Sequence, residues 1–459
     1  MRTKYKRLMS ALSAVVLAAG TGILFPAGAW ATVDACVPAS GLANEGFVAS
    51  AAELEYVIQE GIAEVKVANN FTIVCQPTIM TESLKIDLNG KTVTANAPWA
   101  LDLETANKTL TIEDSGSGGT IDFNDAGIWI QGGANLTIKS GTVSVSAGRG
   151  RGIVLRDGAL SLEGGVVAAS NGASNGGYYP TIVVLNDATT DTSVTISGGV
   201  ITATNGTALS VQNAVNVTMT DGSIIGGDTG VMLDDGASFT MDGGAITAST
   251  WGVAAFNDTE FTMNDGTLTV SASDGIGVAG NGTSNPEANN YGGNARLTLN
   301  GGTIESGDLG VYAPQVGGVT VLGDGLTINA AKCGVEVRAG TLNVNGATIN
   351  VDENAEYAFN PNGSGSTASG VGIAVAQHTT TQAISANVTS GDFTAPVAFA
   401  EANPQHNSEE AIAEVSVAIS GGNFVATNGD PVVASEDLSG FITGGTYSKA
   451  LSDEYVAEG

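Results

Sequence analysis

Residues 217–233 read VTMTDGSIIGGDTGVML, and residues 239–255 read FTMDGGAITASTWGVAA, so the second stretch repeats the pattern of the first. Each stretch contains an apolar-Thr-apolar segment, a turn, a second apolar segment, another turn and a Gly-containing apolar segment. Apolar and polar residues alternate within the segments, which predicts short strands with one buried face. Because such short strands cannot bury their apolar faces alone, the repeated units are expected to stack on one another.

The repeat extends along most of the chain. Apolar-Thr-apolar segments, or close variants, begin at residues 84, 110, 136, 160, 194, 217, 239, 261, 297, 319, 342, 386, 417 and 440. Most neighbouring starts lie 22 to 26 residues apart, and the longer gaps are rich in Gly, Asn and Ser, as expected of insertions. Stacked units pair equivalent strands in parallel, and parallel crossovers are overwhelmingly right-handed. The sequence therefore predicts an all-β fold, a right-handed parallel β-helix with three strands per coil and about 14 coils over residues 62–459, roughly 67 Å long.

The two ends of the predicted β-helix differ. SAAELEYVIQEG at residues 50–61 predicts a capping helix over residues 51–60, because Ser50 and Glu53 form a capping box and Gly61 ends the apolar periodicity. The C-terminal SDEYVAEG at 452–459 offers no comparable cap. We therefore expect the last coil either to fray or to pack against further protein.

The N-terminal residues have the pattern of a secretory signal peptide over residues 1–31. Four basic residues precede an apolar stretch that ends in the small-x-small sequence Ala29-Trp30-Ala31. A lone membrane anchor is the alternative, but Pro26 interrupts the stretch and no basic stop-transfer cluster follows it. The sequence thus predicts a secreted or extracellular cell-surface protein, free of the membrane after cleavage, in which residues 32–61 form an N-terminal segment with the capping helix.

Charge and cysteine content narrow the choice of partners and compartment. The formal charge is −30, and removal of four of the 16 basic residues with the signal peptide gives 12 − 46 = −34. Nucleic acids and anionic membranes are poor partners for such a surface. The three cysteines, at 36, 75 and 333, allow one disulfide and one free thiol. Cys36 and Cys75 are the nearer pair, although spacing alone does not establish that they approach each other.

Several coils resemble those of a known superfamily. SLKIDLNGKTVTA (83–95), LTIEDSGSGGTI (110–121), VAISGGNF (417–424) and GFITGGTY (440–447) are similar to coils of secreted and surface-exposed right-handed β-helix proteins of the pectate-lyase-like superfamily. The resemblance is strongest to the "ISGGTF"-type proteins of Gram-positive bacteria and covers about residues 45–459. It implies the fold, but it leaves activity open, because the superfamily includes polysaccharide lyases and glycoside hydrolases and the shared motifs are turn and core residues.

Acidic residues are abundant in the predicted turns. Asp221 and Asp265 share a column and Asp234 and Asp235 are adjacent, but each lies in a Gly-containing turn. Glycoside hydrolysis needs a carboxyl pair at a defined separation, and stacked coils place acids at such separations by chance. Turn aspartates between 221 and 274 could bridge Ca²⁺, although solvated turns explain the same pattern. The sequence therefore predicts no catalytic pair, no cofactor and at most a weak calcium site.

Basic residues and histidines give no clearer sign of catalysis. A lyase that acts on a uronic-acid polymer needs positive charge to neutralise the substrate carboxylate. Arg149, Arg151 and Arg156 form one basic cluster, but they straddle a predicted strand and do not converge. His378 and His406 lie in polar insertions without an evident nucleophile or metal partner. The residue pattern thus favours a protein that is not an enzyme.

The outward face of the third strand is the candidate ligand-binding surface. Alternation projects Asp102, Trp129, Val154, Val183, Met232, Tyr312 and Glu336 from this face. Together with Arg151, Tyr178 and Tyr179, the residues Asp102, Trp129, Met232 and Tyr312 could form an aromatic platform for sugar rings or a partner protein. The alternative is that the insertions fold over this strip and bury it.

A threonine series on the first strand is a second surface feature. One hydroxyl residue per coil is expected to point outward, at positions 111, 137, 161, 195, 218, 240, 262, 298 and 320. Such a ladder could face ice or a glycan, but Thr is also a common solvent-facing strand residue that hydrogen-bonds to its neighbour. Three hypotheses for function remain: non-catalytic, adhesin-like recognition of a glycan or surface partner, a polysaccharide lyase or glycoside hydrolase, and a structural spacer. The oligomeric state is not indicated.

Overall fold

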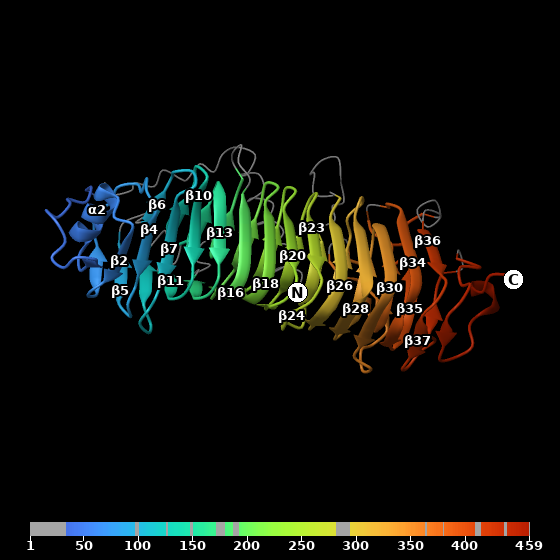
Figure 1. Ribbon diagram of the computed structural model, residues 1–459. Coiled ribbons are helices and arrows are strands. Elements are labelled where there is room, and N and C mark those ends of the chain that lie inside the picture. The colour runs from blue at the N-terminus through green and yellow to red at the C-terminus, as the bar shows by residue number, and fades with distance from the viewer. Residues whose placement is uncertain are drawn as a thin grey trace.

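The computed structural model describes residues 34–96, 101–124, 127–146, 150–170, 180–186, 192–280, 294–362, 365–379, 381–408, 415–435 and 438–458. Over these residues the chain coils into a parallel β-helix, an elongated rod with helix α2 (Ala51–Glu60) at one end and the C-terminal residues at the other (Figure 1). The predicted all-β fold, stacked parallel strands and short capping helix are therefore confirmed. None of the described helices is long and apolar enough to cross a membrane.

Each complete coil has strands at three positions. The first-position strands are β2 (Glu64–Val67), β4 (Leu84–Asp87), β7 (Thr109–Glu113), β10 (Ala134–Ile138), β13 (Gly158–Leu162), β20 (Ser238–Met241), β23 (Glu260–Met263) and β36 (Val415–Ile419). The second-position strands are β3 (Phe71–Ile73), β5 (Thr92–Ala95), β8 (Thr120–Phe123), β11 (Thr142–Val145), β14 (Val166–Ala169), β21 (Ala245–Ala248), β24 (Thr267–Val270), β37 (Asn423–Ala426) and β39 (Thr446–Tyr447).

Some strands run through both of these positions without a break. They are β16 (Ser193–Ala203), β18 (Asn216–Ile225), β26 (Arg296–Ser306), β28 (Val319–Ala330), β30 (Gly340–Val351) and β34 (Ile384–Ala395). These continuous strands join the first and second positions into one 24-stranded sheet, which also includes β1 (Phe47–Val48).

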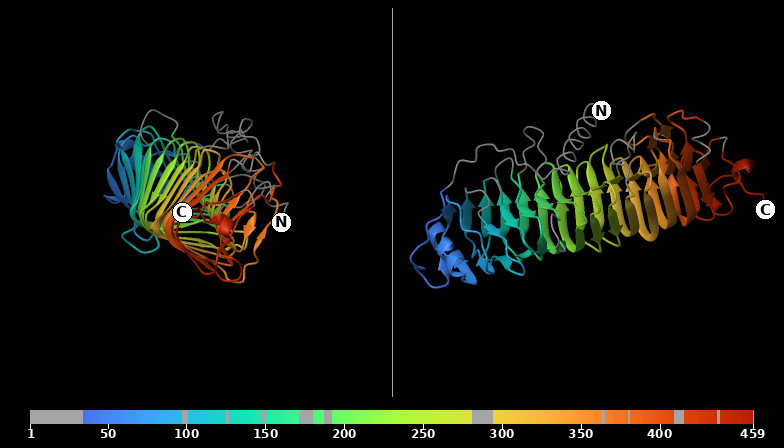
Figure 2. Two further views of the ribbon diagram at one scale, coloured as in Figure 1. Left: turned by 90° about the vertical axis from the view of Figure 1, so that its right-hand side faces the viewer. Right: turned by 90° about the horizontal axis from the view of Figure 1, so that it is seen from above.

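The third-position strands form a separate 13-stranded sheet, called here the third-strand sheet. Its members are β6 (Leu101–Leu103), β9 (Ile128–Ile130), β12 (Ile153–Leu155), β15 (Ile182–Val184), β17 (Thr207–Val211), β19 (Thr229–Leu233), β22 (Trp251–Ala255), β25 (Ile276–Gly280), β27 (Leu309–Ala313), β29 (Cys333–Val337), β33 (Val371–Ala376), β35 (Val397–Ala402) and β38 (Val432–Val433). Viewed from above, strands of successive coils lie side by side along the whole rod (Figure 2).

The core consists of inward columns of apolar side chains. Parallel pairing places Val217, Phe239, Phe261 and Leu297 at equivalent positions of successive coils, and all four are buried. The ring centroids of Phe239 and Phe261 lie 5.9 Å apart. Because equivalent strands of successive coils are paired, the apolar columns continue from coil to coil, as the alternating sequence predicts.

The turn between the first and second positions explains the repeated Gly-Gly pair. Gly199 has a backbone φ of +75°, in the left-handed region that side chains disfavour. A Cβ atom on Gly198 would lie 2.4 Å from the carbonyl oxygen of Glu163 in the preceding coil. One glycine is therefore required by the turn conformation, and the other by the close approach of stacked backbones.

The predicted register is wrong at one position and incomplete at another. Thr320, predicted to point outward, is buried and pairs with Leu297. In VTVL at 319–322 the alternation can be read in either phase, and the pairing of Leu322 with Leu299 places Thr320 inside. The coil of β2 and β3 lies within the predicted residues 62–459, but no repeat start was assigned to it, because EVKV of β2 carries charged residues in place of Thr.

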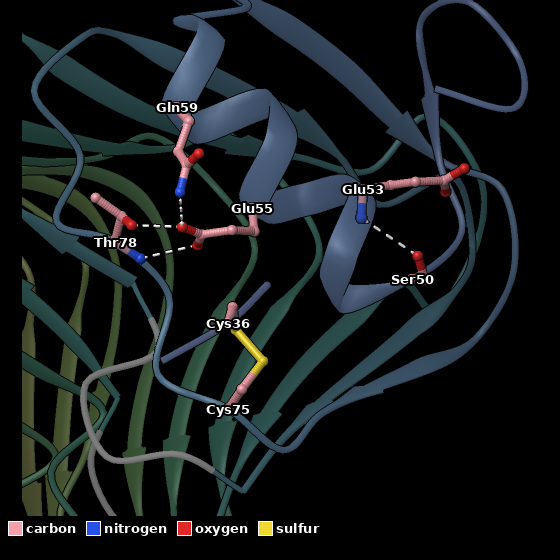
Figure 3. The surroundings of a disulfide bond; sticks show 7 residues. All are labelled: Cys36, Ser50, Glu53, Glu55, Gln59, Cys75 and Thr78. Carbon is pink, nitrogen blue, oxygen red and sulfur yellow. Dashed lines mark hydrogen bonds between the residues drawn. A yellow bond between two sulfur atoms is a disulfide. The ribbon is translucent and has the colours of Figure 1, made fainter. Parts of the chain in front are cut away.

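Helix α2 caps the N-terminal end as predicted. The Ser50 hydroxyl accepts a hydrogen bond from the Glu53 backbone N–H at 3.3 Å (Figure 3). Gly61 ends the helix in the left-handed conformation. The reciprocal half of the predicted capping box differs, because the Glu53 carboxylate accepts the backbone N–H groups of Ala43, at 3.0 Å, and Ala49, at 2.6 Å, in place of that of Ser50. One side chain therefore fastens the helix to the segment that precedes it.

A disulfide between Cys36 and Cys75 ties the leading segment to the first coil (Figure 3). The sequence had left this pairing open. On the same side of the helix, the Glu55 carboxylate accepts hydrogen bonds from the backbone N–H of Thr78, at 2.9 Å, and from the amide of Gln59, at 2.6 Å. Cys333 is the free thiol and is buried, and burial raises its pKa well above the usual range.

The C-terminal segment covers the last coil instead of fraying. Ile442 forms parallel bridges with Ile419 on one side and Val456 on the other. The rings of Phe441 and Tyr455 have centroids 5.3 Å apart, and Tyr455 is the last residue of the 3₁₀ turn η1 (Asp453–Tyr455). The expectation of a frayed last coil is therefore wrong for residues 438–458, because Tyr455 and Val456 supply the final pairing and apolar contacts.

Candidate functional site

The residues predicted to share the outward face of the third-strand sheet are in register. The pairing places Asp102, Trp129, Val154, Val183, Ser210, Met232, Ala254, Ala279, Tyr312, Glu336, Ala374 and Ala400 at equivalent positions of successive strands, called here the outward row. Sequence reasoning missed Ser210 and the alanines, which could have been found by aligning the third strands across every coil.

Most of the outward row is buried. The exposed fractions are 8 % for Trp129, 4 % for Met232 and 5 % for Tyr312, while Glu336 is fully buried. The guanidinium of Arg156 lies 5.5 Å from the centroid of the Trp129 ring. These side chains do not form an open platform, so burial of the strip is the arrangement observed, and a direct ligand-binding role for them remains a prediction.

Two ionisable residues of the predicted site, Asp102 within the row and Arg151, lie toward its N-terminal end. Asp102 is half-buried, and desolvation, followed by the charge of Glu104, raises its pKa to about 7. Arg151 is also half-buried. Tyr178 and Tyr179 lie outside the described residues. Within the described part, the predicted set is therefore split between a packed strip and two partly accessible ionisable side chains.

A second outward row, which the sequence analysis missed, lies beside the first. It contains Thr207, Thr229, Trp251, Ile276, Leu309, Cys333, Val371 and Val397, all in register and all buried. The Trp251 and Phe256 rings meet edge to face, with centroids 6.2 Å apart. Parallel strands buried on both faces have continuous apolar sequences, so runs such as WGVAA at 251–255 and VGIAVA at 371–376 were the available signal.

The insertion of residues 352–369, without 363–364, covers part of this apolar face. It contains the antiparallel strands β31 (Ala358–Phe359) and β32 (Ala368–Ser369). Ala368 belongs to the outer apolar cluster, and Phe359 packs against that cluster from the insertion. We call this segment the 352–369 insertion. It is a folded element of the third-strand sheet's outer face.

A buried carboxylate of the outward row binds this insertion. Glu336 accepts hydrogen bonds from the backbone N–H of Thr367, at 2.9 and 3.0 Å to its two oxygens, and from the N–H of Ala368 at 3.2 Å. The Thr367 hydroxyl also donates to it. Desolvation raises the pKa of Glu336, while the neighbouring Arg338 charge and these donors act in the opposite direction.

Arg338 holds the other side of the insertion. Its guanidinium is fully buried, and its Nε lies 3.7 Å from a Glu336 carboxylate oxygen. It donates to the carbonyl oxygens of Gly365 at 2.8 Å and Asn362 at 2.9 Å, and to the Tyr312 hydroxyl at 3.2 Å. A buried charge is tolerated only when it is paired and hydrogen-bonded, and this pair meets both conditions through the insertion.

His378, a candidate catalytic residue by type, lies next to this pair and is buried. Desolvation, and then the positive charge of Arg338, lowers the pKa of His378 to about 3. Its carbonyl oxygen accepts a hydrogen bond from the Asn407 amide at 2.8 Å. At neutral pH the ring is therefore uncharged, and its burial was not predicted from the polar residues around it in the sequence.

The 352–369 insertion presents aromatic residues at its surface. Tyr357 is 40 % exposed, and its ring meets the half-buried ring of Phe359 edge to face, with centroids 6.1 Å apart. Burial raises the pKa of Tyr357, so its hydroxyl remains protonated at neutral pH. The sequence analysis did not single out this residue; its signal was a lone Tyr in a polar insertion.

The turn aspartates are engaged within their own turns. The Asp221 carboxylate accepts the Gly222 N–H at 2.7 Å, and the Asp265 carboxylate accepts the Gly266 N–H at 2.7 Å. Desolvation, followed by the charge of Asp235, raises the pKa of Asp234 to about 6. In the described part of the chain, no group of three or more His, Cys, Asp or Glu residues is arranged to hold a metal ion.

No protein-family model, curated protein or solved structure matches this chain. The resemblance to pectate-lyase-like proteins therefore remains a prediction from the coil motifs.

Proposed function

We propose that this protein is a secreted or cell-surface β-helix that recognises a glycan or a surface partner without chemical turnover, in an adhesin-like role. The observation that carries the proposal is the exposed Tyr357 on an insertion that Glu336 and Arg338 hold from within the fold. An aromatic ring on a fixed backbone offers contact area without a large loss of conformational entropy on binding.

The way the insertion is held supports a presenting role. Burying a charge pair away from solvent is costly, and such a pair often stabilises a fold no more than apolar residues of similar volume would. At this site the pair instead fixes the position of a surface segment, because its hydrogen bonds end on Thr367, Gly365 and Asn362. Supported side chains of this kind keep a binding residue in one geometry.

The partner class follows from ring chemistry and charge. A tyrosine ring can pack against the apolar face of a sugar while its hydroxyl exchanges hydrogen bonds with sugar hydroxyls. With signal cleavage the formal charge is 12 − 46 = −34, so a polyanionic partner is disfavoured. A neutral glycan, or a surface protein with a neutral or basic contact region, fits best.

One observation favours the alternative of a glycoside hydrolase. Asp102, with its pKa raised to about 7 by desolvation, would suit a general acid at neutral pH. A hydrolase also needs a second carboxyl group at a defined distance across the bond to be cleaved. The structural spacer is the third alternative, and it predicts no retention on any ligand.

The test compares binding by the mature chain, its Tyr357→Ala variant and a matched control. Phe47→Ala serves as the control, because Phe47 is 37 % exposed at the opposite end of the rod, close to the 40 % of Tyr357. Binding is measured on a glycan array and on immobilised mucin, with a thermal melt of each variant. We expect Tyr357→Ala to lose retention with an unchanged melting temperature, while Phe47→Ala binds as the wild type does.

A parallel assay separates recognition from catalysis. Soluble polysaccharides incubated with the mature chain are examined for new reducing ends and unsaturated products. Product formation that is lost in Asp102→Asn would replace the proposal by the hydrolase alternative. Absence of both retention and product would leave the spacer.

A further inference from the structure

An unbroken series of hydroxyl side chains runs along the outer face of the first-position strands. Parallel pairing places these residues at one register position in eight successive coils, and we call them the hydroxyl ladder: Thr111, Thr137, Ser161, Thr195, Thr218, Thr240, Thr262 and Thr298. Seven steps of about 4.8 Å give the ladder a length of about 34 Å. Thr195 is exposed and the other members are half-buried, so every member faces outward.

The threonines of the ladder do not satisfy one another. Within the described residues, none of the threonine hydroxyls of the ladder has a hydrogen-bond partner in the protein. The Ser161 hydroxyl does have one, because it donates to the Glu163 carboxylate at 3.5 Å. The expectation that each threonine bonds to the next is therefore wrong. A nearby polar series behaves differently: Asn264 donates to Asp242 at 2.7 Å, and Asn300 donates to Asn264 at 2.8 Å.

The ladder is uncharged on an acidic protein. Charged residues occupy the same register position only before it, where Lys85 forms an ion pair with Glu64 at 2.9 Å. At the other end Val321 pairs with Thr298 and interrupts the hydroxyls. The ladder is therefore a bounded neutral strip with donor and acceptor capacity at each step.

We propose that the hydroxyl ladder binds the ordered surface of a neutral, hydroxyl-rich polysaccharide. Sugar hydroxyls both donate and accept hydrogen bonds, as the threonine hydroxyls do, whereas an anionic polymer would meet the acidic surface around the strip. This inference rests on the proposed glycan recognition and assigns it a polymer class and a second face, separate from Tyr357.

The geometry explains why the partner must be ordered. A single hydrogen bond to a sugar in water contributes little, because each group exchanges one hydrogen bond with water for another. Paired parallel strands hold the threonines in fixed positions, so successive contacts to one rigid surface follow the first contact without a new loss of translational freedom. β-Branched side chains add to this effect because their χ1 angles are restricted.

The test uses a four-site variant and an internal control of equal size. The ladder variant replaces Thr195, Thr218, Thr240 and Thr262 by Val. The control variant replaces Thr267, Thr303, Thr327 and Thr348 by Val, a shorter in-register series on the second-position strands, also exposed or half-buried. Valine keeps the shape and the strand preference of threonine and removes the hydroxyl. Both variants, Tyr357→Ala and the wild type are mixed with insoluble cellulose, chitin and starch, and the unbound protein is measured.

The expected result is binding of the wild type to at least one insoluble polysaccharide, a tenfold or greater weakening in the ladder variant, and no change in the control variant or in Tyr357→Ala. Equal binding by the ladder variant, or a loss confined to the control variant, overturns the role of the ladder and leaves the proposed function standing. Failure of the wild type on these solids, with Tyr357-dependent retention on the soluble-glycan array, overturns the ladder proposal alone. If the wild type binds neither the insoluble polysaccharides nor the glycan array, both the ladder proposal and the proposed function are overturned. If it inhibits the growth of ice crystals without binding any polysaccharide, the partner of the ladder is ice.

Discussion

Replacing Arg338 by Met is expected to loosen the 352–369 insertion while leaving the coils intact. The substitution removes the charge that lies 3.7 Å from Glu336 and the donors to Gly365 and Asn362. Glu336 then remains buried as a carboxylate without its counter-charge, although the N–H groups of Thr367 and Ala368 still reach it. Methionine retains an unbranched apolar chain of similar length, so the loss of packing is small.

The expected loss of stability of the insertion follows from the burial of Arg338 and Glu336, because both side chains are fully inaccessible to solvent. Breaking such a pair by removing one member costs about 3–5 kcal/mol. Because about 1.4 kcal/mol corresponds to a factor of ten, the insertion should open roughly a hundredfold to a few thousandfold more often. The double variant Arg338→Met with Glu336→Gln removes the stranded charge and should recover most of this loss.

Acidification should also relieve the defect, and the sign follows from the pKa of Glu336. Burial raises this pKa, so the folded state holds the proton more tightly than the unfolded state, and stability is lost as pH rises through the folded pKa. Arg338 opposes that rise, so its removal moves the pKa higher still. The Arg338→Met variant should therefore regain protection as the pH falls toward about 4, and the double variant should not share this recovery.

Hydrogen exchange of individual amides is the appropriate assay, because repeat proteins open in parts and a single melting temperature averages over them. The amides of Thr367 and Ala368 report on the insertion, and that of Ile246 reports on a distant core strand. Unchanged exchange at Thr367 and Ala368 in Arg338→Met, with or without acidification, would refute the idea that the buried pair holds the insertion.

Three further outcomes are expected. Replacing Cys36 and Cys75 by Ala should cost about 2–4 kcal/mol and appear as faster amide exchange in α2, with the central coils unaffected; uniform exchange across α2 and the coils would contradict this. Ile246→Asp should abolish the cooperative transition in circular dichroism, whereas Thr240→Asp should leave it, because Ile246 is fully buried and Thr240 faces outward. Since the pKa of Asp102 is raised to about 7, ionising this carboxyl group costs stability as pH rises from about 4 to 7. In denaturation measured at several pH values, the stability of Asp102→Asn relative to wild type should therefore increase over that window. A constant stability difference would exclude this linkage.

The fold could be predicted from the sequence because almost every coil repeats the same information. Alternation assigns the inward side chains, the Gly-Gly pair locates the first turn, and insertions stand out as longer gaps. The error at Thr320 shows the limit of this reasoning. When apolar residues occupy both faces, as in VTVL, a strand can be read in either phase, and only the pairing of Leu322 with Leu299 decides.

The candidate site was less predictable, since it depends on where insertions pack. Trp129 and Met232 were placed correctly on one face, but their burial is not encoded in the strands themselves. Charged residues inside an otherwise apolar third strand, such as Glu336 in GVEV and Arg338 just after it, were the available signal. Such residues need partners when buried, so they point to the chain segments that cover them.

The two outer faces of the rod therefore differ for a physical reason. On the third-strand sheet, the outward rows carry many apolar side chains, and the 352–369 insertion that covers part of them brings its own backbone donors and acceptors to Glu336 and Arg338. On the first-position strands the outward side chains are already small and polar, so no cover is needed and the hydroxyl ladder remains at the surface. The two proposed recognition surfaces therefore differ in origin: Tyr357 lies on a segment fixed over an apolar face, whereas the hydroxyl ladder belongs to the uncovered repeat itself.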